Sequence, residues 1–316
     1  MRNGRGHPGA GRGGNGPRGT MAEHPLFFFF LMAYVFSWIT LLPFVLSEWG
    51  VLPRGPVPSL FFALNAFTGP FLSAYIMGRV TEGRAAWKEM RRRVRQIRAG
   101  WPMYVFILVG IPALFLAGIL ILPEAAASYD GRAFAFLKSY PFLFVAIFFG
   151  GGPLGEEIGW RGFALPRLQA RFGPLRASLI LGLLWAFWHL PHFLTSAQRG
   201  GPGMSLSVLY FNLPVFLVMV VALSIVFTWV FNRTEGSLFI AMLLHASINT
   251  FAGVTGLFTA SIVKRSDLPF MIVLVALALS IVILTRGRLA AATCEEFSQG
   301  NEASARGAFE AVAKNS

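Results

Sequence analysis

Eight long apolar segments dominate this chain and restrict the folds that it can adopt. A transmembrane helix needs roughly 20 consecutive, mostly apolar residues, and a helix satisfies its own backbone hydrogen bonds inside lipid. Hydrophobic residues make up 55% of the 316 residues and charged residues 13%, which is too apolar for a water-soluble protein of this length. We therefore predict an all-α, polytopic integral membrane protein with about eight transmembrane helices and interfacial amphipathic segments. The apolar segments are centred near Val35, Phe67, Pro112, Phe144, Leu184, Leu217, Leu244 and Leu274.

The basic residues are distributed unevenly between the connecting segments. The net charge is +13, but a membrane protein is first tested against the positive-inside rule. With a cytoplasmic N-terminus, the cytoplasmic segments contain all but six of the 27 Lys and Arg residues. This bias predicts a multi-pass protein of the cell membrane with both termini in the cytoplasm, membrane lipids as partners and no nucleic acid. The six exceptions are Arg54, Arg132, Lys138, Arg199, Lys264 and Arg265.

The chain divides into three parts. Residues 1–21 are rich in Gly and Arg and are expected to form a disordered tail, with Met21 as an alternative start of translation. Residues 22–286 form the predicted transmembrane domain, in which the arginine-rich segments 81–101 and 161–178 are amphipathic and expected at the inner membrane surface. Residues 287–316 form a polar tail. Its Cys294 is the single cysteine, which excludes an internal disulfide and a paired redox motif.

Two adjacent glutamates at the inner end of an apolar segment are the first candidates for chemistry. The stretch GGGPLGEEIGWRGF, residues 150–163, contains Glu156 and Glu157, while the other acidic residues fall in predicted loops, the amphipathic segment or the tails. Residues four apart share a helix face, so Glu157 is expected to pair with Arg161. Glu156 points away from that pair and, partly desolvated beside a second carboxylate, is a candidate general base. The glycines of this stretch favour close helix contacts.

Three histidines lie inside or at the end of apolar segments, where ionisable groups are functional candidates. His189 ends one such segment, and His245 shares a helix face with Asn249, four residues later. An imidazole and a carboxamide on one face offer two donors to a developing oxyanion. With a carboxylate base and an orienting histidine, this set can hydrolyse an amide. His192 either supports His189 or is an interfacial histidine, and we favour the second interpretation.

Three motifs, in this order, resemble those of a known family. Glu156-Glu157-x-x-x-Arg161, an aromatic residue four positions before His189, and His245-x-x-x-Asn249 resemble the motifs of the CAAX prenyl protease and bacteriocin-processing (CPBP) intramembrane endopeptidases. The resemblance covers about residues 141–251. The second motif usually has Phe where this chain has Trp185, and an aromatic packing role survives that change.

The resemblance implies both a fold and a reaction. It implies eight helices around a polar cavity open toward the cytoplasm and the lipid. It also implies cleavage of a membrane-tethered or lipidated peptide near the cytoplasmic face, with prenylated CAAX sequences as the type case and signal-like peptides or bacteriocin precursors as further substrates. Glu156 would activate the water with help from His189, and Glu157 with Arg161 would shape the site. His245 and Asn249 would stabilise the tetrahedral intermediate.

The sequence leaves one alternative open for the cofactor and two for the functional class. If zinc is used, its ligands are Glu156, His189 and His245, a set that suits a catalytic zinc ion. There is no HExxH pair and these residues come from separate helices, so we favour a water activated by glutamate without metal. The rival classes are a catalytically silent membrane scaffold or immunity protein and a proton-coupled carrier. The absence of inverted repeats argues against the carrier.

Overall fold

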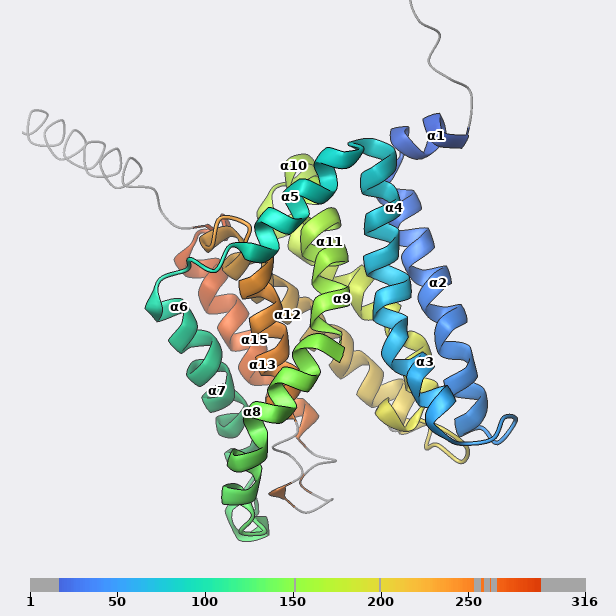
Figure 1. Ribbon diagram of the computed structural model, residues 1–316. Coiled ribbons are helices and arrows are strands. Elements are labelled where there is room, and N and C mark those ends of the chain that lie inside the picture. Colours follow the sequence, from blue (N-terminus) through green and yellow to red (C-terminus); the bar gives the residue numbers. More distant parts are fainter. Residues whose placement is uncertain are drawn as a thin grey trace, which may run out of the picture.

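The computed structural model describes residues 17–150, 152–198, 200–252, 257–258, 262 and 266–290. Every regular element within these ranges is helical (Figure 1), which confirms the all-α prediction. Most of the two predicted tails, including Cys294, lies outside the described residues. At the N-terminal side, helix α1 (Pro17–Glu23) begins before the predicted boundary at residue 22.

Seven helical segments of the described residues are long and apolar enough to cross a membrane. They coincide with seven of the eight predicted segments, and the remaining one forms α13 (Leu238–Ala252), which at 15 residues is shorter. The chain is therefore a multi-pass membrane protein. The seven segments are α2 (Pro25–Glu48), α3 (Pro56–Ala66) with η1 (Phe67–Phe71) and α4 (Leu72–Thr81), α6 (Trp101–Val105) with η2 (Phe106–Gly110) and α7 (Ile111–Leu120), α8 (Ala133–Gly150), α11 (Pro174–Trp188) with η5 (Leu190–Leu194), η7 (Val208–Asn212) with α12 (Leu213–Arg233), and α15 (Asp267–Leu284).

Wider π-helical turns interrupt several of these helices. The turn η1 (Phe67–Phe71) contains Pro70, which has no backbone N–H and so cannot continue a regular hydrogen-bond ladder. The longest such turn, η4 (Ile158–Ala164), directly follows the short helix α9 (Pro153–Glu157). Because π turns in helices often occur at functional sites, the position of η4 directly after Glu157 supports a functional role for the glutamate pair. The other two are η2 (Phe106–Gly110) and η7 (Val208–Asn212).

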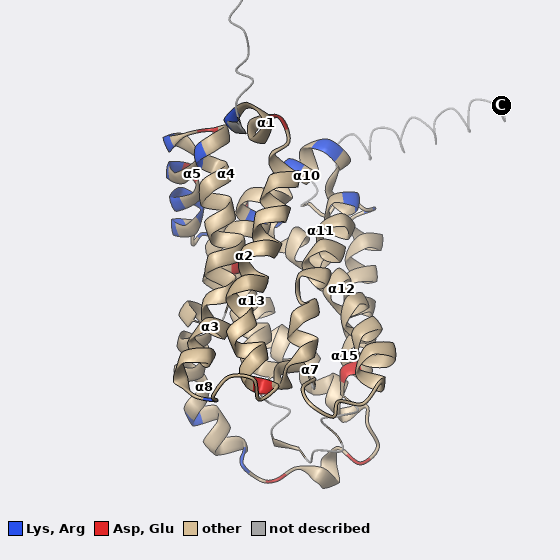
Figure 2. Ribbon diagram, turned by 90° about the vertical axis from the view of Figure 1, so that its right-hand side faces the viewer, with Lys and Arg blue, Asp and Glu red and all other residues tan. Residues whose placement is uncertain are grey.

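Most Lys and Arg side chains lie at one end of the bundle, which we call the basic end. Figure 2 shows them around α1, α5 (Arg84–Arg95) and α10 (Leu165–Phe172). The two predicted amphipathic segments thus contain helices, shorter than the segments themselves. The side chain of Arg167 pairs with Glu82 and lies over the Phe163 ring, its guanidinium carbon 3.7 Å from the ring centroid, so α10 is fixed to the turn before α5.

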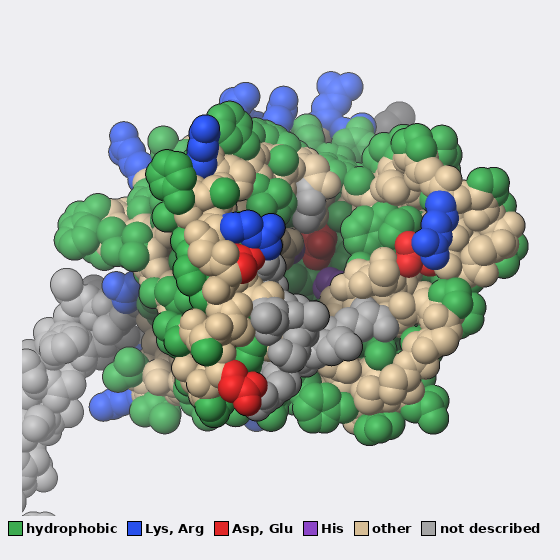
Figure 3. Space-filling model, turned by 90° about the horizontal axis from the view of Figure 1, so that it is seen from below, with side chains coloured by type: hydrophobic (Ala, Val, Ile, Leu, Met, Phe, Trp, Pro, Cys, Tyr) green, Lys and Arg blue, Asp and Glu red, His purple; other side chains and the backbone are tan. Residues whose placement is uncertain are grey.

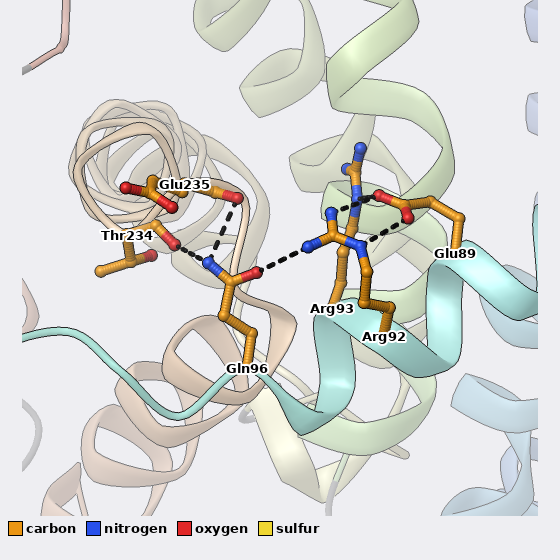
Figure 4. A network of polar contacts seen from close by, with 6 residues as sticks. All are labelled: Glu89, Arg92, Arg93, Gln96, Thr234 and Glu235. Atoms are coloured by element: carbon orange, nitrogen blue, oxygen red, sulfur yellow. Dashed lines mark hydrogen bonds and ion pairs between the residues drawn. The ribbon is translucent and has the colours of Figure 1, made fainter.

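A polar network fastens α5 to the turn between α12 and α13 (Figure 4). Glu89 accepts hydrogen bonds from Arg92 and Arg93 at 2.7 and 2.8 Å, and these two guanidinium groups hold the pKa of Glu89 at about 2. Gln96 donates to the carbonyl oxygen of Thr234 at 2.8 Å. The C-terminal end of α12 therefore lies at the basic end.

The opposite end of the bundle, which we call the distal end, contains the other ends of the same helices. The indole of Trp49, just after α2, donates to the carbonyl oxygen of Leu194 at 2.8 Å. Asn212, just before α12, donates to Asp267 at the start of α15 at 3.0 Å. Helices α11, α12 and α15 thus each run between the basic end and the distal end.

The glutamate-bearing segment packs backbone against backbone on the second membrane segment. A Cβ atom on Gly155 would lie 2.9 Å from the carbonyl carbon of Ala66, and one on Gly159 would lie 2.5 Å from Cβ of Pro70 and 2.7 Å from its carbonyl oxygen. The expectation of close helix contacts is therefore confirmed at these two glycines, whose lack of a side chain sets the distance between α9–η4 and η1.

Replacement of Gly159 with alanine is expected to destabilise the fold. The added methyl group would press on the Pro70 backbone, which cannot rotate away, and overpacking of this kind costs about 1–3 kcal/mol. The matched control is Gly150→Ala, because an added Cβ there meets no atom within 4 Å. We expect the thermal midpoint in detergent to fall for Gly159→Ala and to hold for Gly150→Ala. Equal midpoints for both variants would contradict the close contact.

Candidate active site

Gly152 starts the helix that carries the glutamate pair. Its φ of 106° lies in the left-handed region that favours glycine, and its carbonyl oxygen accepts the backbone N–H of Glu156 at 2.7 Å. A Cβ atom at Gly152 would lie 2.7 Å from Oε1 of Glu156. Two features therefore require glycine at position 152. One is the left-handed backbone conformation, and the other is the space that the Glu156 carboxylate occupies.

Glu157 and Arg161 form the predicted ion pair, and His245 joins them. Oε1 of Glu157 lies 3.1 Å from a terminal nitrogen of Arg161 and 2.7 Å from Nδ1 of His245. The side chains of Glu157 and Arg161 are fully buried, and that of His245 is 6% exposed. The guanidinium carbon of Arg161 lies 4.2 Å from the ring centroid of Trp185 and 4.0 Å from that of Phe227. Two aromatic faces therefore enclose the cation.

Glu156 has different partners from its neighbour. Its Oε2 accepts hydrogen bonds from the indole of Trp185 at 2.7 Å and from that of Trp160 at 3.2 Å. An indole N–H only donates, so both bonds favour a carboxylate that accepts. Glu156 is thus oriented by two aromatic residues, in contrast to Glu157, whose partners are cationic or ionisable.

Trp160 and Trp185 are positioning residues, a role that the sequence alone does not reveal. The sequence indicates only a packing role for Trp185 and none for Trp160. The available signal was the spacing of Trp160, four residues after Glu156 on one helix face. The bond from Trp185, by contrast, joins residues 29 apart in sequence, so it required the structure.

His189 presents one ring nitrogen to the site. Its Nδ1 lies 2.8 Å from the carbonyl oxygen of Trp185. A carbonyl oxygen only accepts, so Nδ1 carries the proton and Nε2 of the neutral ring keeps its lone pair. The ring packs edge-on against Trp188, with centroids 4.7 Å apart.

His192 is buried beside His189, and its position at the membrane interface stays a prediction. It is 8% exposed, and its ring centroid lies 5.4 Å from that of His189 and 5.5 Å from that of Trp188. The turn η5 explains the burial: α11 ends at Trp188, and the 3-10 turn that contains Pro191 places His192 against Trp188 and His189.

One cavity of about 400 Å³ collects the candidate residues from three parts of the chain. Its lining includes Glu156 of α9, His189 after α11, and His245 and Asn249 of α13. Glu157 and Arg161 do not line it and lie behind His245 and Trp185. The structure thus separates the six predicted site residues into four that face the cavity and two that hold His245 from behind.

The described residues do not fit the zinc alternative. No group of three or more His, Cys, Asp or Glu side chains within the described ranges lies close enough to hold a metal ion. Glu156, His189 and His245 share the cavity without converging as ligands on one point.

Comparisons with known proteins agree with the motif order. Residues 138–251 match the family described as Type II CAAX prenyl endopeptidase Rce1-like. A protein of Methanococcus maripaludis named CAAX prenyl protease 2 is 29% identical over 150 residues, which cover 46% of this chain and 53% of that protein. The chain therefore spans about half the length of that relative. The region that matches this family, residues 138–251, contains both glutamates and all four cavity residues, so the similarity extends over the whole candidate site.

Proposed function

We propose that this protein is an intramembrane endopeptidase that hydrolyses a peptide bond in a membrane-tethered peptide, using a water activated by Glu156. The observation that carries the proposal is the shared cavity, in which a carboxylate, two imidazoles and a carboxamide from three parts of the chain face one space. The family match and the relative's name support the same reaction class.

The first step is the attack of water on the scissile carbonyl. Glu156 takes a proton from the water, and Nε2 of His189 accepts a second hydrogen bond that orients it. The oxygen attacks the carbonyl carbon, and the C=O electrons move onto the carbonyl oxygen. Trp160 and Trp185 keep Oε2 of Glu156 fixed during this step.

The second step is the collapse of the tetrahedral intermediate. Its oxyanion accepts hydrogen bonds from the carboxamide N–H of Asn249 and from Nε2–H of His245. His245 donates from Nε2 as an imidazolium, whose Nδ1–H donates to the Glu157 carboxylate. As the C–N bond breaks, Glu156 returns its proton to the leaving amine, so the enzyme ends unchanged.

The substrate and its membrane are also part of the proposal. The relative's name points to prenylated CAAX peptides, and signal-like peptides or bacteriocin precursors present the same combination of a peptide bond and a membrane tether. The bias of the basic residues supports a cytoplasmic location for the basic end, and with it for both termini. Membrane lipids are the remaining partners.

A peptide panel tests the proposed function. The protein, purified in detergent, is incubated with fluorogenic peptides that are prenylated, acylated or apolar without lipid, beside His245→Ala and with and without a chelator. We expect cleavage by the wild type, loss in His245→Ala, and no effect of the chelator. Loss of cleavage with the chelator would reinstate a metal. Intact peptides, on a panel that a related protease cuts, would favour a scaffold, or a carrier if Glu156→Gln also stops proton-coupled uptake.

Trp185→Phe is expected to slow the reaction without unfolding the protein. Phenylalanine keeps a ring beside Arg161 and His245 but removes the hydrogen bond to Glu156. A hydrogen bond to a charged group contributes about 1.5–3 kcal/mol, so kcat/KM should fall roughly tenfold to a hundredfold. Trp188→Phe is the matched control, since the buried Trp188 indole N–H has no hydrogen-bond partner among the described residues. Equal rates for the two variants would show that the indole N–H of Trp185 plays no part.

A further inference from the structure

A groove of about 1380 Å³ lies at the basic end and shares no lining residue with the cavity of the candidate residues. One wall is α5 with the segment that follows it, and the other is the turn between α12 and α13. The hydrogen bond from Gln96 to the carbonyl oxygen of Thr234 joins the two walls (Figure 4). Among the described residues, six basic and two acidic side chains line the groove. The basic ones are Lys88, Arg91, Arg92, Arg95, Arg98 and Arg233.

The sequence of α5 places four of these cations on one helix face. The other face is apolar, since Met90 is buried and the Trp87 ring packs edge-on against that of Phe71, with centroids 5.8 Å apart. This apolar face holds α5 against the bundle and leaves a stripe of cations exposed to solvent, with the three- and four-residue spacings of one helix face. The stripe consists of Lys88, Arg91, Arg92 and Arg95.

Most of the cations in the groove have no acidic partner. Glu89 pairs with Arg92 and Arg93 at 2.7 and 2.8 Å. Within the part of the chain that the structure describes, no ion pair includes the other cations of the stripe. Like charges on one helix face repel each other, so an anion bound in the groove would stabilise the stripe. The distal end differs, because acidic and basic side chains lie there among hydrophobic ones (Figure 3).

An apolar surface continues from the groove along the third membrane segment. Ile97 lines the groove and is 56% exposed. Trp101 and Val105 share one face of α6 and are 75% and 46% exposed. Tryptophan is enriched where a membrane segment meets the interface, so this end of α6 lies at the level of the lipid headgroups. A lipid with its headgroup in the groove would lay its acyl chains along α6.

We propose that the groove binds the headgroup of an anionic lipid that carries two phosphate groups. A single phosphodiester would leave most of the six cations unmatched, whereas two phosphates can contact both walls at once. Basic pockets between helices on the cytoplasmic side of a membrane suit such headgroups. The inference does not depend on the proposed function, because the groove lies outside the candidate active site.

Lipid titration with native mass spectrometry tests the site on the full chain, with cardiolipin as the two-phosphate probe. The groove variant combines Lys88→Gln, Arg91→Gln and Arg95→Gln. A control removes the same charge from exposed positions at the same end but outside the groove: Arg79→Gln, Arg171→Gln and Arg176→Gln. We expect cardiolipin affinity to fall about a hundredfold in the groove variant, at about fivefold per cation, and to change little in the control. Equal losses in both variants would overturn the site.

A second variant tests whether the shape of the groove matters. Gln96→Leu keeps every cation but breaks the bond to Thr234 that joins the two walls. We expect the wild type to prefer cardiolipin over phosphatidylglycerol, which carries a single phosphate, at equal total charge, and Gln96→Leu to lose this preference. A preference that is absent from the wild type, or unchanged in Gln96→Leu, would overturn the two-walled site.

Pyrophosphate distinguishes a lipid headgroup from free phosphate. We expect it to leave cardiolipin bound when both are present at equal phosphate concentration, because it lacks the acyl chains that contact α6. Displacement of cardiolipin by pyrophosphate under these conditions would refute the lipid as the occupant of the groove.

Discussion

Glu156→Gln is expected to reduce peptide cleavage by about 10²–10⁴-fold, the contribution typical of a general base. Glutamine has the size of glutamate, and its amide oxygen still accepts the indole N–H bonds of Trp160 and Trp185. What it lacks is the ability to take a proton from water. The loss should therefore appear in kcat, with KM and the thermal midpoint little changed, and initial rates on a fluorogenic peptide measure it.

The matched control for this variant is Glu235→Gln. Glu235 is an exposed carboxylate at the basic end, in the turn that Gln96 contacts. We expect full activity from Glu235→Gln. If Glu156→Gln cut peptides at a rate within a few fold of the wild type, another group would have to be the base, and Glu157 would be the next candidate.

Arg161→Met is expected to destabilise the protein by about 3–5 kcal/mol, because it leaves the buried Glu157 carboxylate without its cation. Methionine keeps most of the apolar contact with Trp185 and Phe227, so the loss reports on charge more than on volume. A second change, Glu157→Gln, removes the stranded charge, so the double variant should be more stable than Arg161→Met alone. Thermal unfolding in detergent, compared across the single and double variants, gives the coupling between the two residues.

An exposed arginine provides the control for this pair. Arg171 of α10 contacts the Phe172 ring at the surface, and Arg171→Met should leave the thermal midpoint nearly unchanged. If Arg161→Met and Arg171→Met unfolded at the same temperature, the ion pair behind His245 would not contribute to stability.

Segment length, apolar composition and residue spacing were sufficient to predict the helices and the contacts between two residues on one helix. Length and apolar composition predicted the eight segments because a helix in lipid must satisfy its own backbone. The pair of Glu157 and Arg161 followed from a spacing of four, which holds even though η4 winds more widely than an α-helix. The candidate residues followed from the cost of placing ionisable groups in apolar segments.

Contacts between distant segments could not be predicted in this way. Residue spacing along the chain does not predict that Trp185 reaches Glu156, that His192 is buried in the bundle, or that Met90 of α5 lies against Gly162 of η4. Each of these depends on how close two helices approach. Gly155 and Gly159 set the distance between α9–η4 and η1, and Gly162 sets that between η4 and α5, but the partner of a glycine cannot be read from the sequence.

The enclosure of Arg161 by two rings also bears on how the products leave. The described residues that line the cavity include no lysine or arginine, since the guanidinium lies behind Trp185 and Phe227. Hydrolysis creates a new carboxylate beside Glu156, which has just regained its own negative charge. The two anions repel each other, and of the described cavity residues only the His245 imidazolium of the proposed mechanism offsets them, so the cleaved end should leave readily and product inhibition should be weak.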